Sequence, residues 1–269
     1  MQPLEIEKTP LRRYTIALCK GAGLVDETRT LLQNWIPDED LHVFVDRVLQ
    51  NDLLGRATAY RTKDIVRRVF ARRFLSPTDL PARRLRRIID KGLPRKMFIE
   101  ILFVYAARAD HLLYDFTTER FWPECRRGRS DLDNKDVLTF LSEAIEDRRI
   151  ENPWSEKVSL KIARGVLGTL RDIGFLREVG KRHREIIPYY LSNEGAAFLA
   201  YDLHHSGLTD AGICEHTDWH LFGMDRERVL NHLDSLSEES GMIVQRGGSV
   251  VRITWKFETV EELIDALAG

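Results

Sequence analysis

The stretch that decides the fold runs from Asp133 to Leu191 and reads DNKDVLTFLSEAIEDRRIENPWSEKVSLKIARGVLGTLRDIGFLREVGKRHREIIPYYL. Asp133, with Asp136 three residues later, is typical of a helix start, where side-chain oxygens accept hydrogen bonds from free backbone N–H groups. Apolar residues then recur at helical spacing up to Ile145, and residues 148–153 have the composition of a turn. The first element of the stretch is therefore predicted to be an amphipathic helix.

A second helix is predicted to begin after Ser155 and to end at Gly174. Glu156 lies in its first turn, where the helix dipole favours an acid, and glycine readily takes the left-handed conformation that ends many helices. One face of this helix is apolar and the opposite face is basic. The apolar face holds Val158, Ile162, Val166, Leu170 and Ile173, and the basic face holds Lys157, Lys161, Arg164 and Arg171.

Two short strands, Phe175–Val179 and Ile186–Leu191, are predicted after this helix, with a turn at Gly180. Helix, turn, helix and hairpin is the order of a winged helix, in which the second helix can enter the major groove of DNA. Winged helices also serve as protein–protein modules. The coincidence of a basic helix face with a basic hairpin tip favours DNA. The tip comprises Lys181, Arg182, His183 and Arg184.

A second basic region precedes this stretch. Residues 56–96 carry fourteen Lys and Arg against three acids, a local charge of +11 in a chain whose net charge is −1. Like charges one helical turn apart each cost about 0.2–0.5 kcal/mol, so a polyanion would stabilise such a segment. A basic segment set in an acidic remainder is typical of a nucleic-acid surface. The alternative is a solvated helical face of arginines.

The pattern of apolar residues places this basic region on helices. A helix is predicted after Gly23, a second over residues 41–49 capped by Asp38 or Asp40, and a third over about 62–74. Two helices joined by a short Gly-containing turn outline a helix-turn-helix, whose second helix would contact DNA. A further helix from Pro81 buries Leu85 and Ile88 and extends the positive strip. The candidate phosphate contacts are Arg61, Lys63, Arg67, Arg68, Arg72, Arg83, Arg84 and Arg87.

Composition indicates a globular protein with enough apolar residues for a sizeable core. The 269 residues are 43% hydrophobic and 31% charged, a mixture that favours helix. We predict a mainly α, bundle-like fold with helix-turn-helix and winged-helix elements and short β-hairpin wings. The expected domains are residues 1–128, with the basic helix-turn-helix, and residues 129–269, with the winged helix. A fainter copy of the winged pattern near the C-terminus carries acids, which favours packing or a protein partner.

Targeting and redox signals point to the cytoplasm. Residues 1–8 are polar and mixed, unlike a secretory signal, and the longest apolar stretch, residues 97–107, is too short to span a bilayer. Three widely separated cysteines do not suggest a disulfide framework.

One set of side chains could bind a metal, although histidines that cap short helices explain it equally well. This set is His204, His205, Cys214, His216 and His220.

A catalytic site is not expected. Asp110, Asp115 and Glu119 lie near His111 and could suggest a metal-dependent nuclease. On a helix these residues do not share one face, so caps and buried ion pairs with Arg108 are the simpler interpretation. The chain lacks a phosphate-binding Gly-rich loop, a dinucleotide-binding glycine motif and His-Glu-x-x-His. We therefore expect a binding protein that uses no cofactor and no metal.

Short motifs follow one another in a specific order over nearly the whole chain. They are Gly23-Leu24 with Glu27-Thr28, Leu31-Leu32 and Trp35; Asn51 with Leu53-Leu54-Gly55; Ala106, Arg108-Ala109-Asp110, residues 112–116 and Glu119; residues 154–156 with 169–172 and Gly174; and Asp218-Trp219 with residues 249–253. In this order the motifs resemble the BrxA family of bacteriophage exclusion (BREX) phage-defence proteins. The resemblance implies a largely helical, cytoplasmic protein that binds double-stranded DNA beside a methyltransferase and ATPases. It implies no catalytic residue.

The hypothesis from the sequence is a non-enzymatic component of a BREX-type defence system that binds double-stranded DNA. Phosphate contacts would come from the two helix-turn-helix elements and the hairpin tip. The rival hypothesis is an adaptor that scaffolds other BREX proteins, and no membrane contact is expected. On the winged unit the expected DNA contacts are Lys157, Lys161, Arg164, Lys181, Arg182 and Arg184.

Overall fold

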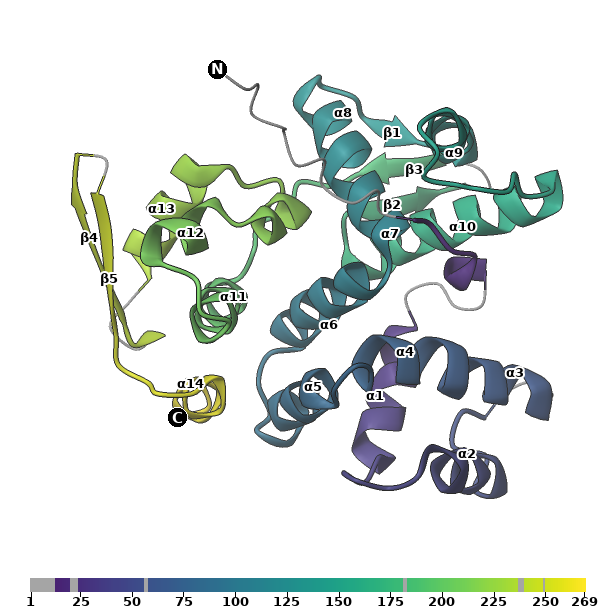
Figure 1. Cartoon of the computed structure of the whole chain (residues 1–269), viewed down its shortest axis with the longest axis horizontal. Helices are drawn as coiled ribbons and strands as arrows, with labels where there is room; N and C mark the ends of the chain where they lie inside the picture. The colour runs from purple at the N-terminus through teal and green to yellow at the C-terminus, as the bar shows by residue number, and fades with distance from the viewer. Residues whose placement is uncertain (1–12, 20–23, 56–57, 181–182, 237–239, 249) are drawn as a thin grey trace, which may run out of the picture.

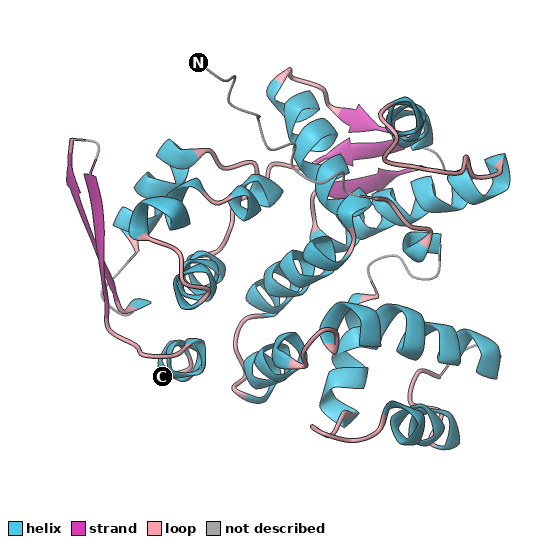
Figure 2. Cartoon of the chain, viewed as in Figure 1, coloured by secondary structure: helices cyan, strands magenta, loops and turns pink. Residues whose placement is uncertain are grey.

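The computed structural model describes residues 13–19, 24–55, 58–180, 183–236, 240–248 and 250–269. The fold is mainly α with short antiparallel strand pairs, as predicted (Figures 1 and 2). Its N-terminal part comprises the 3-10 turn η1 Ala17–Cys19, α1 Val25–Asn34, α2 Leu41–Gln50, α3 Ala59–Asp64, the π-helical turn η2 Ile65–Phe70, α4 Ala71–Phe74, α5 Leu80–Asp90, α6 Arg95–Ala109, α7 His111–Asp115, the π-helical turn η3 Phe116–Phe121 and α8 Trp122–Arg126.

The second half contains two helix-and-hairpin units joined by a buried helix (Figure 1). Each unit places two helices before an antiparallel hairpin. The elements are β1 Asp131–Leu132, α9 Asn134–Glu146, α10 Glu156–Ile173, β2 Leu176–Val179, β3 His183–Ile186, α11 Asn193–His205, α12 Asp210–Glu215, the 3-10 turn η4 Thr217–Phe222, α13 Arg226–Ser235, β4 Met242–Gly247, β5 Val250–Trp255 and α14 Val260–Leu267.

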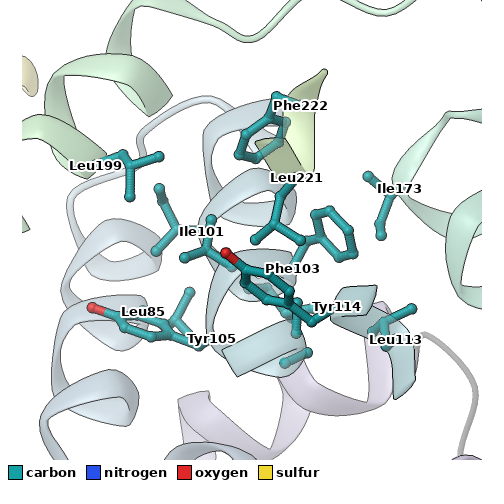
Figure 3. Packing of buried hydrophobic residues seen from close by; sticks show 14 of the residues in the cluster. Leu85, Ile101, Phe103, Tyr105, Leu113, Tyr114, Ile173, Leu199, Leu221 and Phe222 are labelled. Atoms are coloured by element: carbon teal, nitrogen blue, oxygen red, sulfur yellow. The ribbon is translucent and has the colours of Figure 1, made fainter. Parts of the chain in front are cut away.

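Helix α6 lies at the centre of the molecule. Its residues from Met97 to Ala107 are buried almost without interruption, as expected for a helix that is apolar on every side. Figure 3 shows Phe103 and Tyr105 packed among side chains from α5, α7, α10, α11 and η4. The buried cluster therefore contains residues on both sides of position 128, and the division into domains at that position stays a prediction.

The basic N-terminal region contains the predicted helices. Asp40 caps α2 by accepting hydrogen bonds from the backbone N–H groups of His42 and Val43. The third helix begins at Ala59, capped by Thr58, and runs without a break through α3, η2 and α4. Five apolar residues of this helix are buried, at the spacing of one helical face: Ile65, Val66, Val69, Phe70 and Phe74.

The first helix-and-hairpin unit follows the predicted order. Asp133 and Asp136 form a capping box at the start of α9, and Gly174 ends α10 at φ 96°, in the left-handed region. Strand β3 pairs with both β1 and β2, which gives the sheet order β1-β3-β2. The second strand was expected at residues 186–191, but it lies at residues 183–186, where Glu178 pairs with Arg184 and Val179 with His183.

Candidate nucleic-acid interface

The outer face of α10 carries an exposed row of cations. Lys157, Lys161 and Arg164 are exposed at spacings of four and three residues, which align side chains along one face of a helix. On the opposite side Ile162 and Val166 are fully buried. Within the described ranges, no ion pair or hydrogen bond occupies the three cationic side chains. They are therefore available to an external anion.

Close packing fixes the orientation of this helix. Gly165 lies against the carbonyl oxygen of Leu18 in η1, and a Cβ atom at residue 165 would be 2.7 Å from that oxygen. The glycine lets the backbone of α10 approach η1, which presses the apolar side of the helix inward. The basic row consequently points away from the core.

The hairpin beside α10 adds Arg184, which is half-buried on β3. Its Nε atom is buried and has no hydrogen-bond partner. Burial lowers the pKa of Arg184, with Arg164 and Arg171 acting in the same direction and Glu178 opposing them. A bound anion would satisfy this guanidinium. Lys181 and Arg182, the other predicted tip contacts, lie outside the described residues.

The helix α3–η2–α4 presents a second exposed cationic face. Lys63, Arg67, Arg68 and Arg72 are exposed, as predicted, and Arg61 is partly exposed. Arg67 donates a 2.9 Å hydrogen bond to Nδ1 of His42, and Arg68 pairs with Asp64 at 3.2 Å. These side chains lie on the surface but are partly engaged within the protein.

A groove of about 510 Å³ beside this second face has mixed charge. Arg67 and Arg72 contribute to its lining, and the acids are Asp38, Glu39 and Asp79. Carboxylates this close to the arginines would repel a phosphate backbone. The α3–α4 face is therefore less favourable to DNA than the α10 row.

Helix α5 corrects one prediction from the sequence. Arg84 was expected on an outer face, but it is only 7% exposed and bonds to Asp202 of α11 and, at 3.1 Å, to Glu261 of α14. Burial requires such partners for a guanidinium, and two acids from the C-terminal part supply them. Arg84 is not accessible to a phosphate.

The other predicted contacts on α5 are also paired within the protein. Arg83 lies 2.7 Å from Asp79 and 3.0 Å from Asp38. Arg87 donates to Asp265 of α14 at 2.8 Å. The charges of Arg83, Arg84 and Arg87 are therefore balanced by acids within the protein, so a polyanion is not needed to stabilise α5.

Arg84 begins a buried ionic chain that sequence reasoning missed. Asp202 accepts from Arg84 and, at 2.6 Å, from Arg108 of α6, whose Nε donates to Asp218 at 2.8 Å. Burial by itself lowers the pKa of Arg108, but the charges of Asp202 and Asp218 outweigh it and raise the pKa above its usual range. Local sequence patterns could not reveal this network, because its partners are about 100 positions apart in sequence. The one available signal was the presence of charged residues in otherwise apolar helices.

The other candidate centres do not assemble in the described residues. His204 stacks on Trp255, and Nδ1 of His216 accepts from the backbone N–H of Asp218. Within the ranges that the structure describes, no three His, Cys, Asp or Glu side chains are grouped as metal ligands. No described helix combines the length and the apolar character needed to cross a bilayer.

Comparisons with known proteins identify the family. The fold is similar to a crystal structure of an uncharacterized protein from Magnetospirillum magneticum, with a TM-score of 0.56, 18% identity, and coverage of 72% of this chain and 95% of that chain. No curated protein matches the sequence. A sequence profile of the BrxA family matches residues 12–202, which span η1 to α11 and include both cationic faces. The chain belongs to the BrxA family.

Proposed function

We propose that this protein binds double-stranded DNA as a component of a BREX-type phage-defence system. Membership of the BrxA family supports the defence role. The α10 row and Arg184 would form the main contact, with the α3–α4 face as a weaker second contact. The proposed role is binding without catalysis.

One observation carries this proposal: α10 presents three exposed cations with no partner in the described residues, directly beside a hairpin on which Nε of Arg184 has no hydrogen-bond partner. A helix followed by an antiparallel hairpin has the shape that winged-helix proteins use on duplex DNA. Lysine and arginine side chains recognise phosphates chiefly by charge, so the contact is expected to depend on the DNA backbone more than on base sequence.

The contributing cations are exposed, apart from half-buried Arg184. They comprise Lys157, Lys161, Arg164 and Arg184 on the first helix-and-hairpin unit, and Lys63, Arg67, Arg68 and Arg72 on the α3–α4 face. The tip residues Lys181 and Arg182 are retained from the sequence prediction. Arg84 is excluded by its burial, and Arg83 and Arg87 are assigned to internal ion pairs.

A single charge reversal tests the proposal. Lys161→Glu places a carboxylate against the phosphates and is expected to lower duplex affinity about tenfold at constant salt. Fluorescence anisotropy with a labelled duplex measures the change. The matched control is Lys256→Glu, the same substitution at an exposed residue after β5, for which the affinity is expected to stay within about twofold of the parent.

The alternative role as an adaptor is supported by a different surface. Helix α13 exposes Glu227 and Asp234 beside Arg228, a mixed pattern that suits a protein contact better than phosphates. If Lys161→Glu folds normally and binds duplex DNA as the parent does, the DNA role of α10 is wrong. Loss of binding to another defence protein in that same variant would then support an adaptor role for α10.

A further inference from the structure

The hairpin β4–β5 stands at one side of the molecule and packs on α12 and α13 with a single face (Figures 1 and 2). Met242 and Ile253 are buried on that face. The other face exposes two aliphatic side chains, Ile243 at 54% and Val250 at 66%. Exposed aliphatic residues on a two-stranded sheet mark a surface suited to further pairing.

Two hydrogen bonds define which backbone groups of the hairpin point outward. The N–H of Lys256 bonds to the carbonyl of Gly241, so these residues form a hydrogen-bonded pair of the antiparallel ladder. The N–H of Ile253 bonds instead to Oδ2 of Asp210, at 2.9 Å, on the side away from β4. Ile253 is opposite Val244, so that pair is not hydrogen-bonded across the hairpin.

Because hydrogen-bonded and non-hydrogen-bonded pairs alternate along the hairpin, backbone groups at the outer edge of β4 are left without partners in the described residues. In an antiparallel ladder, groups that do not bond across the pair point to the opposite edge. The N–H and C=O of Val244 and, two residues on, Arg246 therefore point out of β4. No hydrogen bond within the described residues takes these groups. The outer edge of β5 differs because Asp210 covers it at Ile253.

We propose that this edge pairs with a second copy of the chain, β4 against β4, antiparallel about a two-fold axis at Gln245. In this register Val244 of each copy is opposite Arg246 of the other, so the open backbone groups of both copies satisfy one another. The product is a four-stranded antiparallel sheet.

The side chains on this edge are complementary to themselves in that register. Exposed Ile243 is placed opposite Gly247, where a Cβ would meet nothing within 4 Å, and Val250 is the cross-strand neighbour of that glycine. Each Ile243 therefore fills the open space at Gly247 of the other copy, and it lies on the same face of the sheet as that copy's exposed Val250.

The charges also permit the pairing. Arg246, the charged residue of β4, would lie opposite Val244 and is already held by Asn231 at 3.1 Å and Asp234 at 3.7 Å. No like charges are directly opposite. The contact is small compared with the roughly 1,200–2,000 Å² of stable interfaces, so the dimer is expected to be weak and to depend on concentration.

Sedimentation equilibrium of the full chain at increasing concentration tests the dimer. The parent is expected to pass from monomer to dimer, and Gln245→Lys, which sets two lysines opposite each other at the axis, is expected to weaken self-association by about tenfold. Gln245 is exposed, so the fold is retained. The control Thr254→Lys adds the same charge to the same face away from the axis and is expected to dimerise as the parent does.

Charge complementation makes the test specific to this register. A mixture of the Gln245→Lys and Gln245→Glu proteins is expected to form heterodimers that the Gln245→Lys protein alone does not form. Heterodimers, detected by native mass spectrometry, would support the two-fold at Gln245. A parent that stays monomeric at millimolar concentration, or a dimer that Gln245→Lys leaves unchanged, would overturn the proposal.

Discussion

Helices α5 and α10 carry similar numbers of basic residues and use them in opposite ways. On α5, Arg83, Arg84 and Arg87 all pair with acids, and Arg84 is buried. On α10, Lys157 and Lys161 are exposed without partners in the described part of the chain. The difference arises because α14 and α11 bring acids to α5, whereas no acidic side chain among the described residues pairs with Lys157 or Lys161 of α10.

The comparison shows that a count of local charge does not locate an interface. A guanidinium already bonded to two carboxylates has little attraction left for a phosphate, because its charge is neutralised at short range. An exposed cation with no partner retains its full charge. The exposed basic row of α10 is consequently a better candidate for DNA than α5.

The largest expected effect is a loss of stability on removal of the buried arginine of α5. Arg84→Ala leaves Asp202 as a buried carboxylate with one partner fewer, and is expected to lower the free energy of unfolding by about 3–5 kcal/mol. Urea denaturation measures it. Lys161→Ala, at an exposed position on α10, is the control and is expected to change the free energy by no more than about 0.5 kcal/mol. Equal effects for the two variants would refute the contrast in burial.

Charge reversal of the whole α10 row should have the next largest effect, this time on binding. The triple variant Lys157→Glu, Lys161→Glu, Arg164→Glu is expected to lower duplex affinity about 100-fold in an anisotropy titration, because three phosphate contacts become repulsive. Arg87→Gln on α5 provides the comparison and is expected to bind as the parent does. A larger loss for Arg87→Gln than for the triple variant would assign the interface to α5.

The α3–α4 face is expected to contribute less. Reversal of Arg67, Arg68 and Arg72 to Glu should reduce duplex affinity about tenfold, since the acids of the adjoining groove already weaken its attraction for phosphates. Circular dichroism should show an unchanged helix content, because all three side chains are exposed. A loss greater than that of the α10 triple would reverse the ranking of the two faces.

The smallest effect concerns the surface ion pairs of α5. Hydrogen bonds from Arg87 and Lys91 lower the pKa of Asp265 to about 2 from its usual 3.8. A carboxyl whose pKa is lower in the folded state contributes stability above its unfolded pKa, and the contribution is lost as pH falls through the folded pKa. Asp265→Asn should therefore destabilise slightly at neutral pH, with the difference from the parent shrinking between pH 4 and pH 2.

Thermal melts across that pH range test the linkage. The control is Asp234→Asn, an exposed acid on α13 whose arginine partner is 3.7 Å away. A difference between Asp265→Asn and the parent that grows as pH falls would contradict the ion pair. A direct check is the carboxyl titration of Asp265 by NMR.

Much of the fold could be predicted from local signals. The capping box at Asp133, the left-handed Gly174 and the apolar spacing of α10 are determined by residues within a few positions of each other, so the sequence displays them directly. The exposure of Lys157, Lys161 and Arg164 follows from the same spacing. Family membership was also predicted from the order of short motifs and is confirmed over residues 12–202.

The parts that could not be predicted depend on distant partners. Arg84 lies on the same helix as Arg83, but it is buried where it contacts Asp202 and Glu261, which lie 118 and 177 positions later in the sequence, whereas Arg83 stays on the surface. Strand β3 was placed three residues too late because the apolar run 186–191 resembles a strand, whereas pairing with β1 and β2 selects residues 183–186. Strand pairing and side-chain burial depend on tertiary contacts, which local propensity does not determine.

The salt dependence of duplex binding tests the central claim most directly. If about six phosphates are neutralised, a plot of log K against log salt concentration for the parent should have a slope of about −5, and replacing Lys157, Lys161 and Arg164 by Gln should reduce it to about −2 to −3. The corresponding replacement of Arg83 and Arg87 on α5 should leave the slope unchanged. Binding that is insensitive to salt, or a slope that falls only in the α5 variant, would contradict the account.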